Sequence, residues 1–131
     1  DISIEDQQIY IDKVRGITLQ TSLLRGLVAK FTRYYSGQLL LNKLSRKLES
    51  WQELDFGEFI KEINKSIKKS GRVELTKIDE MEWMDVFETK KSEVQALKAE
   101  INETDAEIDQ MVYNLYELTN EEIAIVENSI N

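Results

Sequence analysis

Residues 76–118 read TKIDEMEWMDVFETKKSEVQALKAEINETDAEIDQMVYNLYEL and contain neither glycine nor proline. Apolar side chains recur there alternately four and three residues apart, which is the heptad spacing of a helix packed along a partner helix. Lys90 and Thr104 interrupt this seam with polar side chains. We expect one helix on the order of 60 Å long, at about 1.5 Å per residue, and such a helix needs a second one beside it. The apolar seam positions are Trp83, Phe87, Val94, Leu97, Ile101, Ile108, Met111, Leu115 and Leu118.

A second seam of the same kind occupies the N-terminal part of the chain. We predict that its helix begins after Ser3, whose hydroxyl can accept a hydrogen bond from the first turn. We predict that it stops at Gly37, which supplies a left-handed turn. This helix is the natural antiparallel mate of the first one. Its seam positions are Tyr10, Val14, Ile17, Thr21, Leu24, Val28, Phe31 and Tyr35.

Shorter helices are predicted between and after the two seams. Residues 40–51 carry leucines and a tryptophan at helical spacing and predict a short amphipathic helix. Asp55 and Glu58 form a capping box that starts the next helix, which carries Phe59, Ile60, Ile63 and Ile67 inward and ends at Gly71. A further box, Thr119 with Glu122, starts a last helix after the long one.

These signals together predict an all-α fold. We expect an elongated antiparallel helical hairpin, coiled-coil-like, with two or three shorter helices packed on it. The 131 residues, 41% hydrophobic and 32% charged, are enough for one modest core, so residues 1–131 are expected to form a single helical domain. The chain starts at Asp1 rather than at Met, which suggests a piece of a longer protein.

The composition excludes most kinds of catalytic and metal-binding site. Cysteine and histidine are absent, so thiol nucleophiles, imidazole bases and the usual zinc ligands are excluded. Asp85, Glu88 and Lys90 have a spacing close to that of metal-dependent nucleases, but positions two apart on a helix point about 200° from each other. We therefore expect no catalytic, cofactor or metal site. The sequence also has neither an apolar run near 18 residues nor a signal-type start, so we expect no membrane contact and a cytoplasmic location.

The net charge of −8 is distributed unevenly. Residues 1–72 hold 13 Lys/Arg against 9 Asp/Glu, and residues 73–131 hold 4 against 16. No acid occurs between Lys13 and Leu48, so this basic run can face a polyanion or can lie against the acidic half of the chain. Neutral groups for hydrogen bonds to a DNA backbone lie nearby at Tyr34, Tyr35, Gln38 and Asn42. The candidate phosphate contacts are Lys13, Arg15, Arg25, Lys30, Arg33, Lys43, Arg46 and Lys47.

Several other polar and aromatic residues are expected to have structural roles. Thr104 and Asp105 are expected to form a polar layer that fixes the register of the two helices. Four large aromatic side chains outside the basic run are expected to pack in the core or the hairpin rather than to stack on bases. They are Trp51, Trp83, Tyr113 and Tyr116.

Residues 107–127, EIDQMVYNLYELTNEEIAIVE, closely resemble the chain end of type IIG-like restriction-modification enzymes and related adenine-specific DNA methyltransferases. Residues 2–13 and 44–59 resemble two further segments of that family, in the same order and at similar spacing. One departure is Glu117, where the family usually has glycine, and we expect it to lengthen the long helix slightly.

The resemblance implies that this region follows a methyltransferase domain and a target-recognition domain. It would be a helical spacer that positions those domains on double-stranded DNA. The family's Asn-Pro-Pro-Tyr motif and its cofactor-binding glycine motif lie upstream, so S-adenosylmethionine is implied for the parent protein and no cofactor for this fragment. The alternative is a purely structural coiled-coil module for dimerisation or docking without DNA contact. The fragment itself is expected to be a monomer or a weak dimer.

Overall fold

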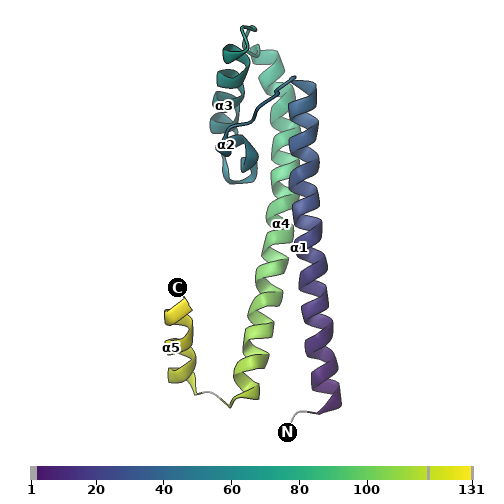
Figure 1. Ribbon diagram of the computed structural model, residues 1–131, viewed down its shortest axis with the longest axis vertical. Coiled ribbons are helices and arrows are strands. Elements are labelled where there is room, and N and C mark those ends of the chain that lie inside the picture. Colours follow the sequence, from purple (N-terminus) through teal and green to yellow (C-terminus); the bar gives the residue numbers. More distant parts are fainter. Residues whose placement is uncertain (1–2, 118, 131) are drawn as a thin grey trace. The chain divides into compact units, whose positions relative to one another are not determined.

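The computed structural model describes residues 3–117 and 119–130, and most of them are helical (Figure 1). No strand occurs within these ranges, so the predicted all-α class is confirmed. The elements are α1 (Ile4–Gln38), α2 (Arg46–Glu49), the 3-10 helix η1 (Trp51–Glu53), α3 (Phe56–Lys69), α4 (Lys77–Leu115) and α5 (Asn120–Ile130).

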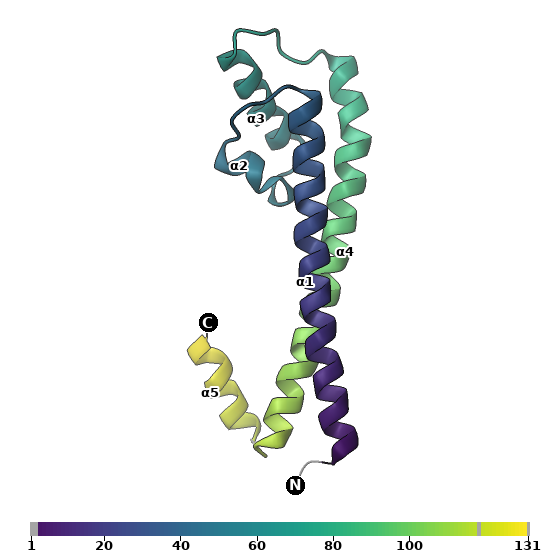
Figure 2. The same ribbon diagram turned by 45° about the vertical axis from the view of Figure 1, so that its right-hand side comes forward.

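The chain divides into two compact units, and both long helices contribute to each of them. Unit 1 comprises Asp1–Ser22 and Ala99–Asn131, and unit 2 comprises Leu23–Lys98. Within each unit a segment of α1 and a segment of α4 run antiparallel side by side, as Figures 1 and 2 both show. The predicted antiparallel pairing of two long helices is therefore confirmed inside each unit.

Unit 2 is built around a cluster of aromatic side chains from every part of its chain. The rings of Phe31 and Trp51 meet edge to face at 4.6 Å, and those of Phe59 and Phe87 stack at 4.6 Å. Tyr35 packs edge-on against Phe59 at 5.2 Å. All five side chains are at most 2% exposed, and such pairs add about 0.5–1.5 kcal/mol each beyond their buried area.

The polar atoms in this core have partners. The Tyr35 hydroxyl donates to the carbonyl of Leu48, and Trp51 Nε1 donates to the carbonyl of Val28 at 3.2 Å. Burial raises the pKa of the Tyr35 hydroxyl far above its usual range. These two bonds tie the segment that contains α2 and η1 to α1, because buried donors are costly without an acceptor.

The α4 seam is confirmed over most of its length. The reciprocal bonds of Thr76 and Asp79 cap its first turn (3.1 and 3.0 Å). The predicted seam positions from Trp83 to Met111, Lys90 and Thr104 included, are buried or half-buried. Leu115 is 47% exposed, however, and so is only partly covered, while Leu118 lies outside the described residues.

The α1 seam is confirmed from Val14 to Tyr35, with Tyr10 40% exposed at its start. The predicted stop at Gly37 is wrong, because α1 continues to Gln38 and the left-handed residue is Leu40, at φ 53°. The Leu41 N–H donates to the Ser36 carbonyl at 2.9 Å, which closes the helix end around Leu40.

Arg72, from the connection between α3 and α4, completes this helix end. Its guanidinium donates to the carbonyls of Leu39 at 2.8 Å and Leu40 at 3.0 Å. A cation at the C-terminal end of a helix also meets the negative end of the helix dipole. Arg72 therefore fixes the end of α1 to the loop that precedes α4.

The helix predicted over residues 40–51 is much shorter in the structure. Only Arg46–Glu49 is α-helical, and its first turn is capped by Ser45, whose Oγ accepts from the Leu48 N–H at 3.2 Å. The left-handed conformation of Leu40 prevents a helix from starting there, and Leu40 itself is 68% exposed. The helix predicted from Asp55 is confirmed as α3, with its capping box and with Gly71 in the left-handed region at φ 79°.

Unit 1 contains the first half of α1, the last part of α4, and α5. Ser3 Oγ accepts from the Asp6 N–H at 3.0 Å, which confirms the predicted N-cap. The expected lengthening at Glu117 is wrong, because α4 ends at Leu115 and Glu117 adopts a left-handed conformation, φ 52°. The capping box of Thr119 and Glu122 is formed (3.2 and 3.1 Å), and its bonds lower the pKa of Glu122.

Candidate nucleic-acid interface

The two units carry opposite net charges. Unit 2 holds 15 Lys/Arg and 12 Asp/Glu, a net charge of +3. Unit 1 holds 2 Lys/Arg and 13 Asp/Glu, a net charge of −11. Six of the eight candidate phosphate contacts, from Arg25 to Lys47, belong to unit 2. Coulomb attraction therefore favours unit 2 over unit 1 as the part that would face a polyanion.

Three of the six cations share one exposed side of α1. Arg25, Lys30 and Arg33 fall within an arc of about 140° at 100° per residue, on the side away from Phe31 and Tyr35. All three are exposed, and none has an acidic partner within ion-pair distance in residues 3–117 and 119–130. We call these three residues the α1 basic face. Their charges are free to meet phosphates.

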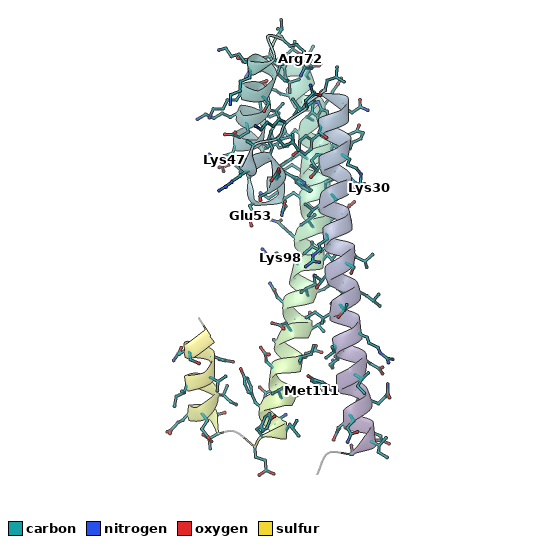
Figure 3. All side chains as sticks on the ribbon, viewed as in Figure 1. Lys30, Lys47, Glu53, Arg72, Lys98 and Met111 are labelled. Atoms are coloured by element: carbon teal, nitrogen blue, oxygen red, sulfur yellow. The ribbon has the colours of Figure 1, made fainter. Side chains whose placement is uncertain are left out.

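The other three candidate phosphate contacts of unit 2 lie on α2 and the loop before it. Lys47 Nζ is 3.9 Å from the buried carboxylate of Glu62, which Lys65 also approaches, at 3.5 Å. Lys43 and Arg46 are exposed and have no acidic partner within the part of the chain that the structure describes. Figure 3 shows Lys47 and Lys30 on opposite sides of unit 2 in that view. The predicted set therefore does not form one continuous surface.

The two candidate cations of unit 1 lie in an acidic environment. Lys13 forms an ion pair with Glu107 of α4, so this part of the basic run lies against the acidic helix, as the second interpretation of the run predicted. Arg15 is exposed within a unit of net charge −11. Neither is well placed to bind phosphate.

A shallow groove of about 490 Å³ adjoins the α1 basic face. Arg25 and Arg33 line it, together with Gln52 and Glu49 from the α2–η1 segment. Its floor is apolar, and the Oε1 atom of Gln52 is buried without a hydrogen-bond partner among the described residues. Sequence reasoning did not find this groove. The signal for it was the spacing of eight residues between the two arginines, with the small Ala29 midway.

Of the four neutral residues predicted to hydrogen-bond to phosphates, three are exposed. Tyr34, Gln38 and Asn42 are exposed. Tyr35 was wrongly included, because it is 0% exposed and its hydroxyl is used within the core. The heptad position explains why Tyr35 is buried and Tyr34 is exposed, since Tyr35 lies on the α1 seam and Tyr34 lies beside it.

The other residues considered as possible sites lie on α4. Asp85, Glu88 and Lys90 all lie on α4, and Lys90 pairs with Glu93 at 3.4 Å. Thr104 is half-buried, but its hydroxyl donates to the Glu100 carbonyl of its own helix at 3.0 Å, and Asp105 is exposed. These contacts do not form the predicted polar layer between the two helices. No group of three or more acidic, His or Cys ligands for a metal occurs among the described residues.

The aromatic predictions are confirmed except at the end of α4. Trp51 and Tyr113 are buried, and Trp83 packs against Tyr34 with ring centroids 5.7 Å apart. Tyr116, expected to pack, is 70% exposed. Within the described ranges, none of the helices has a stretch that is both long and apolar enough to cross a membrane.

Comparison with curated proteins gave no significant match, and neither did comparison with solved structures. One family profile does match, over residues 3–112, and it describes a domain of unknown function, DUF8810. The match ends before most of the 107–127 string, so it leaves the resemblance to restriction-modification enzymes as a prediction. Because it covers more than four fifths of the sequence, the chain belongs to the DUF8810 family.

Proposed function

We propose that this chain is a helical spacer module of a DNA restriction-modification methyltransferase and that the α1 basic face of unit 2 contacts the phosphate backbone of double-stranded DNA. The single observation that carries the DNA contact is the set of three exposed cations on one side of α1, which have no acidic partner among the described residues. The enzyme class rests on the sequence resemblance. In such a parent protein the methyltransferase domain would bind S-adenosylmethionine, and this module would position that domain and the target-recognition domain on DNA.

The charge distribution supports an oriented contact. Phosphate contacts supply affinity and orientation without reading sequence, which suits a spacer. Unit 2, at +3, would approach the duplex, whereas unit 1, at −11, would be repelled by it. Arg25, Lys30 and Arg33 together offer about three phosphate contacts, and each contributes about 0.9 to the slope of log K against log salt concentration.

Fluorescence anisotropy with a labelled duplex of about 20 base pairs, titrated at several salt concentrations, tests the contact. Reversing the α1 basic face in a triple variant (Arg25→Glu, Lys30→Glu, Arg33→Glu) is expected to weaken binding by tenfold or more and to lower the salt slope by about 2 to 3. A matched control reverses Lys61, Lys69 and Lys98. These are exposed cations of unit 2 that lie outside the acid-free run and have no acidic partner among the described residues.

The two triple variants change the net charge equally, so only a local contact separates them. If both bind DNA as the wild type does, the α1 basic face does not contact phosphate. If both weaken binding equally, the attraction is a property of net charge alone and the proposed face is rejected. Far-UV circular dichroism verifies that each variant keeps its helix content.

A second candidate function is a purely structural module, and the ion pair of Lys13 with Glu107 favours it. In that case the basic run serves to hold α1 against α4. This function predicts no measurable duplex binding at low salt. Sedimentation equilibrium then distinguishes a docking module, which stays monomeric alone, from a dimerisation module.

A further inference from the structure

Unit 1 leaves one end of its apolar seam uncovered. Tyr10 on α1 and Leu115 on α4 occupy seam positions in their heptads, yet they are 40% and 47% exposed. In both views the ribbons of α1 and α4 diverge toward the start of α1 and the end of α4 (Figures 1 and 2). In unit 2 the corresponding seam residues Phe31, Tyr35 and Phe87 are fully buried.

The rest of unit 1 does not compensate with a core of its own. Tyr113 is the one apolar side chain that is more than nine-tenths buried among the described residues of unit 1. Ile11 lies next to Tyr10 on α1 and is also exposed. Tyr10 and Ile11, adjacent in sequence, therefore add exposed apolar surface next to the seam end.

Helix geometry places a group of acids on the same side of unit 1 as Ile11. Lys13 and Glu107 are ion-paired and so mark one side of the helix pair. Residues two positions away point about 200° from them. Ile11 on α1, and Asp105 and Asp109 on α4, therefore face the opposite side.

These acids are crowded and unneutralised. Burial first, then the charges of Asp105 and of Glu127 on α5, raise the pKa of Asp109. None of the three carboxylates has a cation within ion-pair distance among the described residues of unit 1. Arg15 is the one cation on this side, also two positions from Lys13. A partner that brings positive charge would relieve the repulsion.

We infer that this open face of unit 1, formed by Tyr10, Ile11 and Leu115 beside Asp105, Asp109 and Glu127, docks a basic amphipathic helix of another protein. The apolar side of that helix covers the uncovered seam end, as a third helix does in a bundle. Its Lys and Arg side chains pair with the three carboxylates. Pairing of two copies through this same face does not fit, because unit 1 of each copy carries −11, and DNA is repelled by unit 1 for the same reason.

Binding of a designed peptide to the full chain tests the inference. The probe is a labelled helix of about three heptads with Leu on one face and Lys on the other. One control peptide replaces every Lys with Glu, and another keeps the Lys but replaces every Leu with Gln. The expected result is binding of the Leu/Lys peptide at least tenfold tighter than either control.

Variants of the chain then locate the site. Ile11→Gln with Leu115→Gln, and separately Asp105→Asn with Asp109→Asn, are each expected to weaken peptide binding about tenfold. The matched controls make the same chemical changes at exposed positions of unit 2. Val73→Gln with Met81→Gln and Asp85→Asn with Glu88→Gln should leave the affinity within a factor of two.

Two results would overturn the inference. The first is equal weakening by the unit 1 variants and their unit 2 controls, which would mean that the peptide binds by net charge alone. The second is self-association of the chain through Ile11 and Leu115 in sedimentation equilibrium, lost in the glutamine variant, which would make a second copy the occupant. Amide chemical shifts of the wild-type chain give a readout that needs no variant, because the peptide must perturb Tyr10, Ile11 and Leu115 and leave Val73 and Met81 unchanged.

Discussion

At the scale of single residues, the end of α1 depends on which backbone position is left-handed. Leu40 has φ 53°, a conformation that costs a residue with a Cβ about 1–2 kcal/mol and costs glycine little. Gly37 is helical, and a Cβ added to it would meet nothing within 4 Å. The glycine and the left-handed turn are therefore three residues apart.

Two substitutions at these residues are expected to stabilise the chain. Leu40→Gly removes left-handed strain, and Gly37→Ala raises helix propensity by about 1 kcal/mol, so each should raise the free energy of unfolding in urea by about 0.5–1 kcal/mol. The reverse arrangement, with Gly37 left-handed, predicts the opposite sign for Gly37→Ala. A loss of stability in that variant would contradict the structure of the helix end. Gly26→Ala, in the middle of α1 with open space around it, is the matched control for propensity alone.

At the scale of elements, features set by periodicity and capping were predictable from the sequence, whereas those set by tertiary contacts were not. The seams of α1 and α4 and the boxes at Asp55 and Thr119 were found because each depends on residues close together in the chain. The end of α1 was missed because it is completed by the guanidinium of Arg72, distant in sequence. The prediction at Gly37 was wrong because local preference yields to such contacts. The left-handed conformation of Glu117 was also not predicted.

The candidate site shows the same division. Exposure of the three arginine and lysine side chains on the α1 basic face results from their distance from the seam, and this was predictable. Whether a cation is already in an ion pair depends on the tertiary structure. The pairs of Lys13 with Glu107 and of Lys47 with Glu62 therefore could not be assigned from the sequence. The groove beside Arg25 and Arg33 also depends on where the η1 segment lies.

The contact of α5 with α4 is expected to depend on pH through Asp109. Its pKa is raised in the folded chain by burial, then by Asp105 and Glu127, so the folded state favours the protonated carboxyl. The charged form therefore costs stability at neutral pH, and this cost disappears as the pH falls through the folded pKa toward the ordinary value. Asp109→Asn removes the cost at every pH.

Amide hydrogen exchange of α5 measures this effect directly. At pH 7, exchange in α5 is expected to be slower in Asp109→Asn than in the wild type, and at about pH 3 the two should agree because the wild-type carboxyl is then neutral. Asp85→Asn, an exposed acid of α4 in unit 2, is the control and should leave α5 unchanged at both values. Faster exchange in Asp109→Asn at pH 7 would show that the carboxylate stabilises α5.

At the scale of the whole molecule, the unequal charges of the two units predict unequal responses to salt. Unit 1 carries −11 and has few neutralising cations, so raising NaCl from about 50 mM to about 500 mM should screen its self-repulsion and stabilise it. Unit 2 is near neutral at +3 and holds the aromatic core, so its stability should change little. Both tryptophans, Trp51 and Trp83, lie in unit 2, so their fluorescence reports that unit alone, whereas circular dichroism reports helices of both units.

Thermal unfolding observed with the two probes separates the units without any substitution. At low salt the dichroism transition should begin below the fluorescence transition, because unit 1 melts first. At high salt the two should converge, with the dichroism midpoint moving up and the fluorescence midpoint nearly fixed. Coincident transitions at both salt concentrations would mean that the two long helices couple the units into one cooperative structure. In that case the aromatic core of unit 2 would also stabilise unit 1 against its own charge repulsion. Replacing Asp105 and Asp109 with lysine would then raise the dichroism and fluorescence midpoints together.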